Sequence, residues 1–389
     1  MNILYIHTTE ERDAEIFKAF ENTDATLFEY ESPAPGEKDE TYVTGLLKAM
    51  EENSIDICFS LMYFPIVSVA NQAMKKTYIA YCQRPYNPSL YSCTLVNECN
   101  VVFVPDYTVY EKFVGEGFNN VFFMPIGVDA SVIPEKVTEE DSEGDDGIDL
   151  TITEEIGSRA DVEINLLSSA SPLKDATKGY LEGCIACRHQ IRGLPSMYQY
   201  LPPYIKEEIL KMTPPVLVGD SVETPATYFD NRSFNHLVTI ADRDIHFSTL
   251  IKNDHFEKVR VYADGYENDL EKVETFGTLA RGAEFNEAVR RSKINLIIPH
   301  RNWQSGVSGR TWDTLAAGGY VMEPFMADLT GLFETPLEYL FTDEFSMVSK
   351  SINRLHHPEE RVETVNSLLQ EIRDKHTYMH RIATIFDVL

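Results

Sequence analysis

Short apolar runs alternate with amphipathic stretches along residues 1–133. Strands are predicted at 2–7, 25–30, 55–61, 76–82, 100–105 and 120–127, and helices at 13–20, 41–53, 66–75, 89–98 and 107–116. The runs at 55–61, 76–82 and 100–105 are almost continuously apolar, which is typical of parallel strands covered on both faces. Repeated strand–helix units of this kind predict a doubly wound α/β domain.

An acidic segment interrupts this pattern. Residues 134–149, PEKVTEEDSEGDDGID, contain two glycines and almost no large apolar side chains. This composition is typical of a linker or exposed loop, which we place over 134–159. The carboxylates lack the alternating spacing of a calcium-binding EF-hand loop, so a solvated surface segment is the preferred interpretation.

The second half of the chain returns to strands and helices. Strands are predicted at 160–169, 258–264, 293–300, 320–324 and 338–343. Helices are predicted within 174–212 and at 233–254, 283–292, 311–319, 345–355 and 358–387. A second α/β domain is therefore expected over 160–375, with a helical segment at 174–212 and a final helical piece at 376–389. Ligands of doubly wound sheets bind outside the carboxyl ends of the strands.

Length and charge narrow the classes of function. The chain has 389 residues, enough for two domains with separate cores. It has no apolar run long enough to span a membrane and does not begin like a signal peptide, so we expect a cytoplasmic protein. A net charge of −28 argues against nucleic acid and anionic membranes as partners. A nucleotide diphosphate would require local arginines or backbone N–H groups to oppose that charge.

The strongest candidate site lies at 293–334, which is predicted as strand, glycine-containing loop, helix and strand. Gly306 and Gly309 would let the backbone approach a ligand closely. The helix expected from about Thr311 would direct its N–H groups at an anion over the loop. Arg301 and Arg310 flank the loop, and a guanidinium group suits phosphate oxygens.

The role of Asp313 stays open at this level. If the helix begins near Thr311, Asp313 lies in its first turn. A carboxylate there would accept hydrogen bonds from ribose hydroxyls, or it would stabilise the start of the helix.

Two short motifs suggest metal chemistry, and neither has the required context. Asp242-x-Asp244 resembles a metal-binding carboxylate pair, but it precedes an apparent helix, so helix capping is the preferred interpretation. Cys184-x-x-Cys187 has no second cysteine pair at the spacing of a zinc site. His246 is read as an ordinary helix residue, and no metal site is predicted.

Several segments together resemble one family. They are MYFPIVS (62–68), YNPSLYS (86–92), residues 95–129, residues 179–193, SGVSGRTWDTLAAGG (305–319) and HTYMHR (376–381). In these segments the chain resembles the CgeB/YkvP-like glycosyltransferases, which are GT-B proteins. The resemblance implies two Rossmann-like domains whose parallel sheets face each other across a cleft. It also implies a donor bound mainly by the C-terminal domain and an end helix that returns to the first domain.

The same resemblance implies a site and a reaction. Residues Gly306 to Arg310 take the place of the diphosphate loop, and Asp313 takes the place of the ribose carboxylate. The full donor-binding set is His300, Arg301, Ser305, Gly306, Val307, Ser308, Gly309, Arg310, Thr311 and Asp313. The implied activity is transfer of a sugar from a nucleotide sugar, with UDP-sugars favoured, to a glycan or protein acceptor. It would proceed with retention and without a metal or other cofactor.

Four residues at three places depart from the family pattern. Ser305 stands where retaining GT-B enzymes often have an acidic residue, and Gln83 stands where relatives have an aspartate. Glu323 and Pro324 replace a Thr-Asn pair. Two alternatives therefore stay open: a catalytically silent GT-B protein that binds nucleotides or glycans, and a sugar-nucleotide epimerase. The sequence does not specify the donor sugar, the acceptor, the catalytic base or the oligomeric state.

Overall fold

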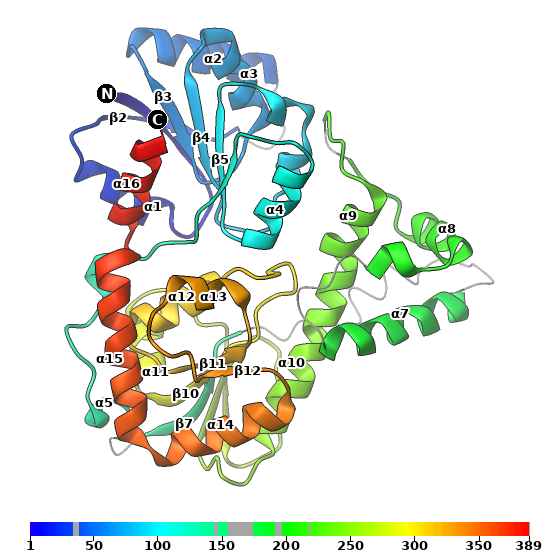
Figure 1. Cartoon of the computed structure of the whole chain (residues 1–389), viewed down its shortest axis with the longest axis vertical. Helices are drawn as coiled ribbons and strands as arrows, with labels where there is room; N and C mark the ends of the chain where they lie inside the picture. The colour runs from blue at the N-terminus through cyan, green and yellow to red at the C-terminus, as the bar shows by residue number, and fades with distance from the viewer. Residues whose placement is uncertain (34–38, 144–146, 155–173, 191–196, 218, 389) are drawn as a thin grey trace. The chain divides into compact units, whose positions relative to one another are not determined.

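The computed structural model describes residues 1–33, 39–143, 147–154, 174–190, 197–217 and 219–388. These residues form two compact units (Figure 1). The N-terminal unit comprises residues 1–129, 216–224 and 377–389, and the C-terminal unit comprises residues 130–215 and 225–376. Each unit contains a six-stranded parallel sheet flanked by helices.

The sheet of the N-terminal unit has the strand order β2-β1-β3-β4-β5-β6. Its strands are β1 (Asn2–His7), β2 (Thr26–Glu31), β3 (Ile57–Ser60), β4 (Thr77–Tyr81), β5 (Asn100–Val104) and β6 (Val121–Phe123). The helices are α1 (Asp13–Glu21), α2 (Asp39–Glu52), α3 (Pro65–Met74) and α4 (Tyr107–Gly115). Every residue of β3 is buried, as its continuous apolar run predicts for a strand covered on both faces.

The helix predicted at 89–98 is instead two short 3₁₀ turns, η1 (Pro88–Tyr91) and η2 (Cys93–Val96). The side chain of Asn87 accepts a hydrogen bond from the Ser89 N–H, and that of Ser92 accepts one from the Thr94 N–H. These side chains compete with helical hydrogen bonding, so they divide the segment into two turns.

The helix predicted at 358–387 is also divided, into α15 (Pro358–Lys375) and α16 (Tyr378–Val388). The division falls where the chain passes from the C-terminal unit to the N-terminal unit, between His376 and Thr377. In the N-terminal unit, α16 lies against α1 (Figure 1). Ile382 and Ile385 belong to the same core cluster as Ile3.

The sheet of the C-terminal unit has the order β12-β11-β10-β7-β8-β9. Its strands are β7 (Ile148–Ile152), β8 (Val259–Tyr262), β9 (Val273–Phe276), β10 (Ser292–Leu296), β11 (Val321–Pro324) and β12 (Leu340–Phe341). Counted along the chain, this is the order 3-2-1-4-5-6, which is that of dinucleotide-binding sheets. The helices around it are α5 (Glu139–Glu143), α11 (Ala283–Arg290), α12 (Gly309–Ala316), α13 (Ala327–Leu332), α14 (Glu344–His356) and α15.

Strand β7 corrects the interpretation of the acidic segment. Part of the expected linker at 134–159 is a fully buried central strand, and α5 precedes it. Asp149 made β7 look polar, but its carboxylate accepts hydrogen bonds from the Glu257 and Lys258 N–H groups and pairs with Lys293. A buried, fully engaged carboxylate cannot be told from a solvated one by composition. The strand predicted at 160–169 lies outside the described residues.

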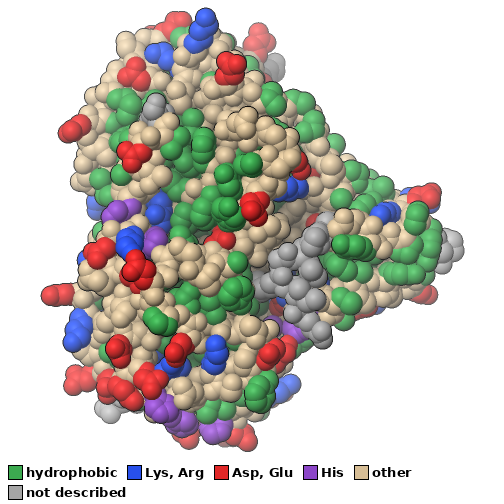
Figure 2. All heavy atoms as spheres, viewed as in Figure 1, with side chains coloured by type: hydrophobic (Ala, Val, Ile, Leu, Met, Phe, Trp, Pro, Cys, Tyr) green, Lys and Arg blue, Asp and Glu red, His purple; other side chains and the backbone are tan. Residues whose placement is uncertain are grey.

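A helical segment of the C-terminal unit has its own core. It consists of α7 (Lys174–Gln190), η4 (Met197–Tyr200), α8 (Pro203–Met212), α9 (Pro225–Phe229), the π-helical turn η5 (Asp230–Phe234) and α10 (Asn235–Ile251). Hydrophobic side chains, tyrosines included, gather on its surface (Figure 2); Tyr180, Tyr200 and Tyr204 are among the exposed ones. In the described parts of the chain, no helix combines the length and apolar character needed to cross a membrane.

Gly127 tests the packing of α16 in the N-terminal unit. A Cβ atom at this position would lie 3.0 Å from Tyr378 Cδ1, 3.0 Å from Arg381 Cγ and 3.2 Å from the Tyr378 backbone nitrogen. We expect Gly127→Ala to destabilise the protein by about 1–3 kcal/mol through overpacking, as measured by chemical unfolding. Gly115→Ala is the matched control, since a Cβ there meets nothing within 4 Å. Equal stability of the two variants would contradict the role given to this contact.

Candidate functional site

The topology of the C-terminal unit indicates at which edge of its sheet a ligand would bind. Strand β7 pairs with β8 on one side and with β10 on the other, so the direction of chain progression reverses between β7 and β10. Ligands of open α/β sheets bind at the carboxyl ends of the strands flanking such a point. Residues 297–308 follow β10 and lead into α12, so the predicted donor loop begins at this edge.

The start of α12 is held by a chain of hydroxyl contacts. Ser308 is the N-cap, and its Oγ accepts a hydrogen bond from the Thr311 N–H at 3.1 Å. The Thr311 hydroxyl donates to the fully buried carboxylate of Glu323 on β11 at 2.8 Å. The helix therefore begins at Gly309, two residues before the predicted start. Glu323, one of the departures from the family pattern, supports the base of the helix.

The glycine pair after α12 has a structural role. Gly318 has a φ of 86°, a backbone conformation that glycine adopts without strain. A Cβ on Gly319 would lie 2.9 Å from Asn295 Nδ2 and 2.8 Å from Thr314 Cγ2. The two glycines therefore end α12 and let the chain approach β10 before it enters β11.

Asp313 pairs with an arginine that the sequence analysis did not identify. Its carboxylate accepts a hydrogen bond from Arg281 Nε at 2.9 Å, and the Asp313 side chain is only 9% exposed. Because α12 begins at Gly309, Asp313 is its fifth residue and lies beyond the first turn. The effect of the helix dipole on a side chain is confined to that turn, so stabilisation of the helix start is not its role.

Arg310 is the more weakly held of the two flanking arginines. Its guanidinium carbon lies 4.7 Å from the centre of the Phe285 ring, and one of its nitrogens lies 3.5 Å from the Leu279 carbonyl oxygen. Neither contact involves a carboxylate. Arg310 is only partly buried, so it can exchange these contacts for an anion at modest cost.

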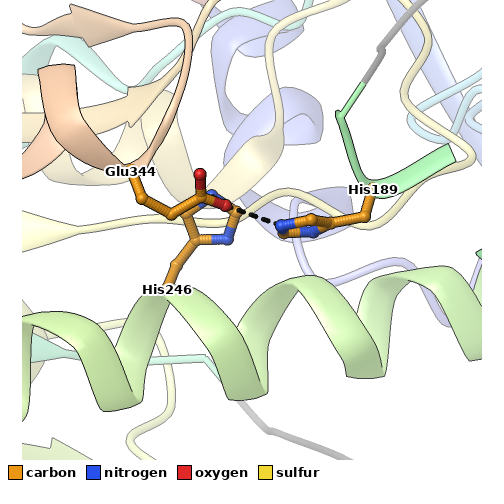
Figure 3. Close-up of side chains that lie close together, drawn as sticks. All are labelled: His189, His246 and Glu344. Atoms are coloured by element: carbon orange, nitrogen blue, oxygen red, sulfur yellow. Dashed lines mark hydrogen bonds and ion pairs between the residues drawn. The ribbon is translucent and has the colours of Figure 1, made fainter. Parts of the chain in front are cut away.

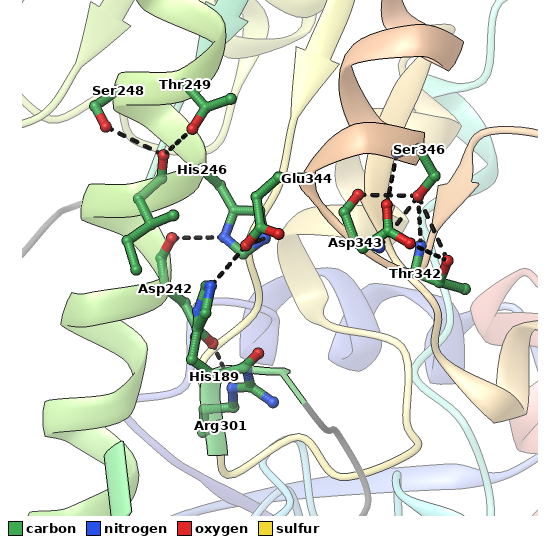
Figure 4. Close-up of polar contacts among 11 residues, drawn as sticks. His189, Asp242, His246, Ser248, Thr249, Arg301, Thr342, Asp343, Glu344 and Ser346 are labelled. Atoms are coloured by element: carbon green, nitrogen blue, oxygen red, sulfur yellow. Dashed lines mark hydrogen bonds and ion pairs between the residues drawn. The ribbon is translucent and has the colours of Figure 1, made fainter. Parts of the chain in front are cut away.

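Arg301, in contrast, is buried in an ion pair. Its guanidinium donates to the Asp242 carboxylate and, at 3.0 Å, to the His189 backbone carbonyl (Figure 4). Its backbone N–H donates to the Thr239 hydroxyl at 2.9 Å. The Arg301 side chain is 3% exposed and that of Asp242 is fully buried. Arg301 thus ties the loop after β10 to α10.

The interpretation of Asp242 as a helix cap was wrong. Asp242 lies in the middle of α10, which begins seven residues earlier at Asn235. Asp244 is exposed, whereas Asp242 is buried, so the two carboxylates do not face a common ligand. The apolar spacing extends through the whole helix, but the two acidic residues within it imitate a helix start.

His300 forms a neutral pair with His236. The Asn302 N–H donates to His300 Nδ1 at 3.1 Å, so the ring proton of His300 is on Nε2, which lies 3.4 Å from His236 Nδ1. Burial, together with the charge of Arg243, lowers the pKa of His236 below its ordinary value. A neutral His236 accepts this hydrogen bond.

Glu154, two residues after β7, was missed by the sequence analysis. Its carboxylate accepts a hydrogen bond from the Ile298 N–H and pairs with Arg243 at 3.0 Å. Arg243 in turn donates to the Ile298 carbonyl at 3.0 Å. Glu154 therefore fixes the first residues after β10. The sequence pattern did not predict β7 as a strand, so nothing in the sequence around Glu154 marked it as a residue of the site.

Three side chains in the C-terminal unit form a cluster able to hold a metal ion. One ligand atom each from His189, His246 and Glu344 lies within 4.8 Å of the others (Figure 3). The interpretation of His246 as an ordinary helix residue therefore missed its neighbours. These residues come from three separate helices, and no spacing in the sequence relates them.

The C-terminal unit also has a cavity of about 910 Å³, which does not coincide with the predicted donor loop. It lies between α11 and the segment around α5, and its walls include Glu140, Asp141, Arg290 and Arg291. None of the predicted donor residues lines it. The carboxyl ends of β7 and β10 are the better guide to a nucleotide site, because that edge also carries a helix N-terminus.

Polar groups also lie at the carboxyl ends of strands in the N-terminal unit. His7, the last residue of β1, has Nδ1 2.7 Å from Asp13 and Nε2 3.1 Å from Glu29. Gln83 follows β4, is 5% exposed, and donates from Nε2 to the Tyr81 carbonyl. Its Oε1 has no hydrogen-bond partner among the described residues. This second departure from the family pattern therefore presents a buried acceptor atom.

Comparisons with known proteins support the topology. A family model described as glycosyl transferase-like matches residues 243–387, a segment that includes the loop after β10 and all of α12. A search of curated proteins found no match.

Several solved structures are similar over the whole chain at low sequence identity. A glycosyltransferase from Rickettsia africae matches 99% of this chain and 97% of its own, with a TM-score of 0.50 and 9% identity. Anabaena Alr3699/HepE, solved in complex with UDP and glucose, matches 100% of both chains, with a TM-score of 0.51 and 11% identity. The N-terminal domain of Candida albicans trehalose-6-phosphate phosphatase matches 100% of this chain and 96% of its own, with a TM-score of 0.50 and 10% identity.

At these identities the likeness concerns the fold. Two Rossmann-like domains, each with a six-stranded parallel sheet, define the GT-B class, and the predicted fold class is confirmed. The segment that matches the glycosyl transferase-like model includes the loop and the helix start at the sheet edge described above.

His7 gives the N-terminal unit a specific pH dependence. Burial opposes protonation, but hydrogen bonds with Asp13 and Glu29 outweigh it and raise the pKa of His7 above 6.5. A raised pKa means that the protonated histidine stabilises the fold fully below about pH 6.5 and loses this contribution as the pH rises through the folded value. We expect His7→Gln to lower the thermal midpoint at about pH 5.5 more than at about pH 8.5. A pH-independent difference would exclude this contribution.

Proposed function

We propose that the chain is a glycosyltransferase of the CgeB/YkvP-like type that uses a UDP-sugar as donor and a glycan or protein as acceptor. The observation that carries the proposal is the start of α12. Contacts among Ser308, Thr311 and Glu323 fix this helix start. It follows β10, one of the two strands between which the direction of chain progression reverses, and it lies in the segment that matches the glycosyl transferase-like model. HepE, which shares the fold, has been solved with UDP and glucose.

The donor diphosphate would lie over the N-terminus of α12. Helix N-termini favour anions through their unpaired N–H groups and through the dipole. A local site of this kind is needed because the chain carries a net charge of −28. Arg310 adds a guanidinium group that is held only by an aromatic ring and one long hydrogen bond.

Of the two predicted arginines, we assign the direct phosphate contact to Arg310. Releasing Arg301 would leave the buried Asp242 carboxylate without its arginine partner, at a cost of about 3–5 kcal/mol. Arg301 is instead proposed to position the loop, together with His300 beside it. The backbone from Ser305 to Gly309 would line the phosphate site.

Asp313 is proposed to bind the donor ribose. Arg281 holds its carboxylate from one side, so the orientation of the carboxylate is set before a ligand arrives. A carboxylate accepts hydrogen bonds from two vicinal hydroxyl groups, and such charge-assisted bonds contribute about 1.5–3 kcal/mol each.

The proposed chemistry needs no metal at the diphosphate. In the transfer step a nucleophilic atom of the acceptor forms the new bond to the sugar C1 and gives up its proton to a base, while the bond between C1 and the diphosphate oxygen breaks and UDP leaves with the electron pair. The helix dipole and Arg310 stabilise the charge that develops on that oxygen. Retention of configuration is proposed from the family resemblance. The catalytic base is not assigned.

A catalytically silent nucleotide- or glycan-binding protein is the second candidate. Ser305, which takes the place of an acidic residue, favours it, since its side chain offers no carboxylate to the sugar. The two candidates differ in one measurement. A transferase releases UDP from a UDP-sugar when it is mixed with acceptor or, slowly, with water, whereas the silent protein binds the donor and leaves it intact.

Arg310→Ala tests the phosphate contact. Loss of a charged hydrogen bond of about 1.5–3 kcal/mol should weaken UDP binding about tenfold or more, as measured by calorimetry. Arg291→Ala is the matched control, because Arg291 is an exposed arginine just after α11 that pairs with Glu287 and lines the cavity. Weaker binding by Arg291→Ala with unchanged binding by Arg310→Ala would move the donor to the cavity and overturn the assignment.

Asp313→Asn tests the ribose contact separately from the phosphate contact. The variant should bind UDP about tenfold more weakly, because it lacks the charge that strengthens the hydroxyl contacts. Its affinity for inorganic pyrophosphate, which has no ribose, should stay close to that of the wild type. Arg310→Ala should lose affinity for both ligands. UDP affinity that depends on added Mg²⁺ or Mn²⁺ would contradict the metal-free diphosphate site.

A further inference from the structure

Three helices of the C-terminal unit bring two imidazoles and a carboxylate together (Figure 3). His189 lies near the end of α7, His246 in α10, and Glu344 is the first residue of α14. Glu344 Oε1 lies 2.6 Å from His189 Nε2 and 3.9 Å from His246 Nε2. Both histidines therefore point the same nitrogen at one carboxylate oxygen.

The other nitrogen of each ring is oriented by Asp242 (Figure 4). His246 Nδ1 lies 2.6 Å from the Asp242 backbone oxygen, and His189 Nδ1 lies 2.7 Å from the Asp242 carboxylate. A carbonyl and a carboxylate only accept hydrogen bonds, so both Nδ1 atoms carry a proton. In the neutral rings both Nε2 atoms then present a lone pair. Contacts of this kind orient and strengthen histidines that bind metals.

Burial and charge suit a cation at this position. The His189 and His246 side chains are 12% and 7% exposed, whereas Glu344 is 42% exposed. Arg301 pairs with the second oxygen of Asp242, so the charge of Asp242 is largely balanced and Glu344 supplies the negative charge of the cluster. The open side at Glu344 would admit an ion and leave it room for a water ligand.

We infer that His189, His246 and Glu344 form a binding site for a divalent transition-metal ion, with Zn²⁺ the best fit. The bound ion would link α7, α10 and α14. Two imidazole nitrogens and one carboxylate oxygen are ligands that zinc accepts, whereas calcium and magnesium require oxygen ligands. Ligand atoms on a tetrahedral zinc ion lie about 3.3 Å apart, given metal–ligand distances of about 2.0–2.2 Å. The two separations to Glu344 lie on either side of that value.

The site is separate from the proposed donor site. Its three ligands are not among the residues assigned to the nucleotide, and binding of the ion does not depend on glycosyl transfer. The two sites meet at Asp242, which orients both histidines and also holds Arg301. The ion would therefore stabilise the base on which the loop after β10 is positioned, and the diphosphate itself would still need no metal.

The test uses the full, untagged chain, treated with a chelator and then titrated with Zn²⁺ by calorimetry. We expect one equivalent to bind and the thermal midpoint to rise on binding. His189→Gln, His246→Gln and Glu344→Gln should each lower the affinity by at least about tenfold, since even a residue that only orients a ligand contributes about 10–100-fold. His255→Gln, which replaces an exposed histidine of the same unit, should bind as the wild type does.

Thiols need their own control, because Cys184 and Cys187 lie on the same helix as His189. Neither cysteine is fully buried. The Cys184→Ser/Cys187→Ser variant should keep the Zn²⁺ affinity, and bound Co²⁺ should give a tetrahedral visible spectrum without a thiolate charge-transfer band. Circular dichroism and a cooperative thermal transition establish that each variant is folded.

Three results would overturn the inference. They are the lack of saturable Zn²⁺ binding by the wild type, unchanged affinity in folded His189→Gln and His246→Gln, and loss of binding in the double cysteine variant. UDP binding is measured in separate titrations, so failure of the metal site and failure of the donor site give different results.

Discussion

The buried carboxylate of Asp242 is the constraint on which the candidate site depends. It is fully enclosed in the middle of α10, where an uncompensated charge would be unsustainable. Arg301 and His189 supply the compensation, one from the loop after β10 and the other from α7. Removing one partner of such a pair costs about 3–5 kcal/mol, so the loop after β10, α7 and α10 fix one another's positions.

A second buried ion pair fixes the loop after β10 where it lies next to the end of β7. Glu154 accepts a hydrogen bond from the first residues after β10 and is compensated by Arg243, which also comes from α10. Helix α10 thus contacts this loop through two neighbouring residues, Asp242 at Arg301 and Arg243 at Ile298. A loop held at both places loses little entropy when a ligand binds, which favours precise placement of the groups it presents.

The start of α12 adds a third fixed point, through the hydroxyls of Ser308 and Thr311 and the carboxylate of Glu323. Compared with these residues, Arg310 is held weakly, by its contact with the Phe285 ring. In a chain with a net charge of −28, a positive field at this edge depends on local sources such as the helix dipole and Arg310. The strong contacts position the site, and the weak contact leaves a cation ready for an anionic ligand.

The sequence by itself determined most of the fold. Continuous apolar runs such as 55–61 specify buried parallel strands, because a sheet covered on both faces needs apolar side chains in both directions. The strand–loop–helix pattern at 293–319 also located the candidate site. The strand β7 was hidden, since composition cannot distinguish the engaged carboxylate of Asp149 from a solvated one.

Only the tertiary structure decided the partners of the charged residues. The sequence marked Arg301 and Arg310 as equivalent cations, but one is buried against Asp242 and the other lies over Phe285. The sequence identified Asp313 as a candidate but did not identify its partner Arg281. It also gave no indication that His246 lies close to Glu344. Contacts between distant helices depend on how the elements pack, and no local spacing encodes that packing. The sequence therefore specifies the elements and the kinds of chemistry they carry, while packing determines which charges are neutralised inside the fold and which can meet a ligand.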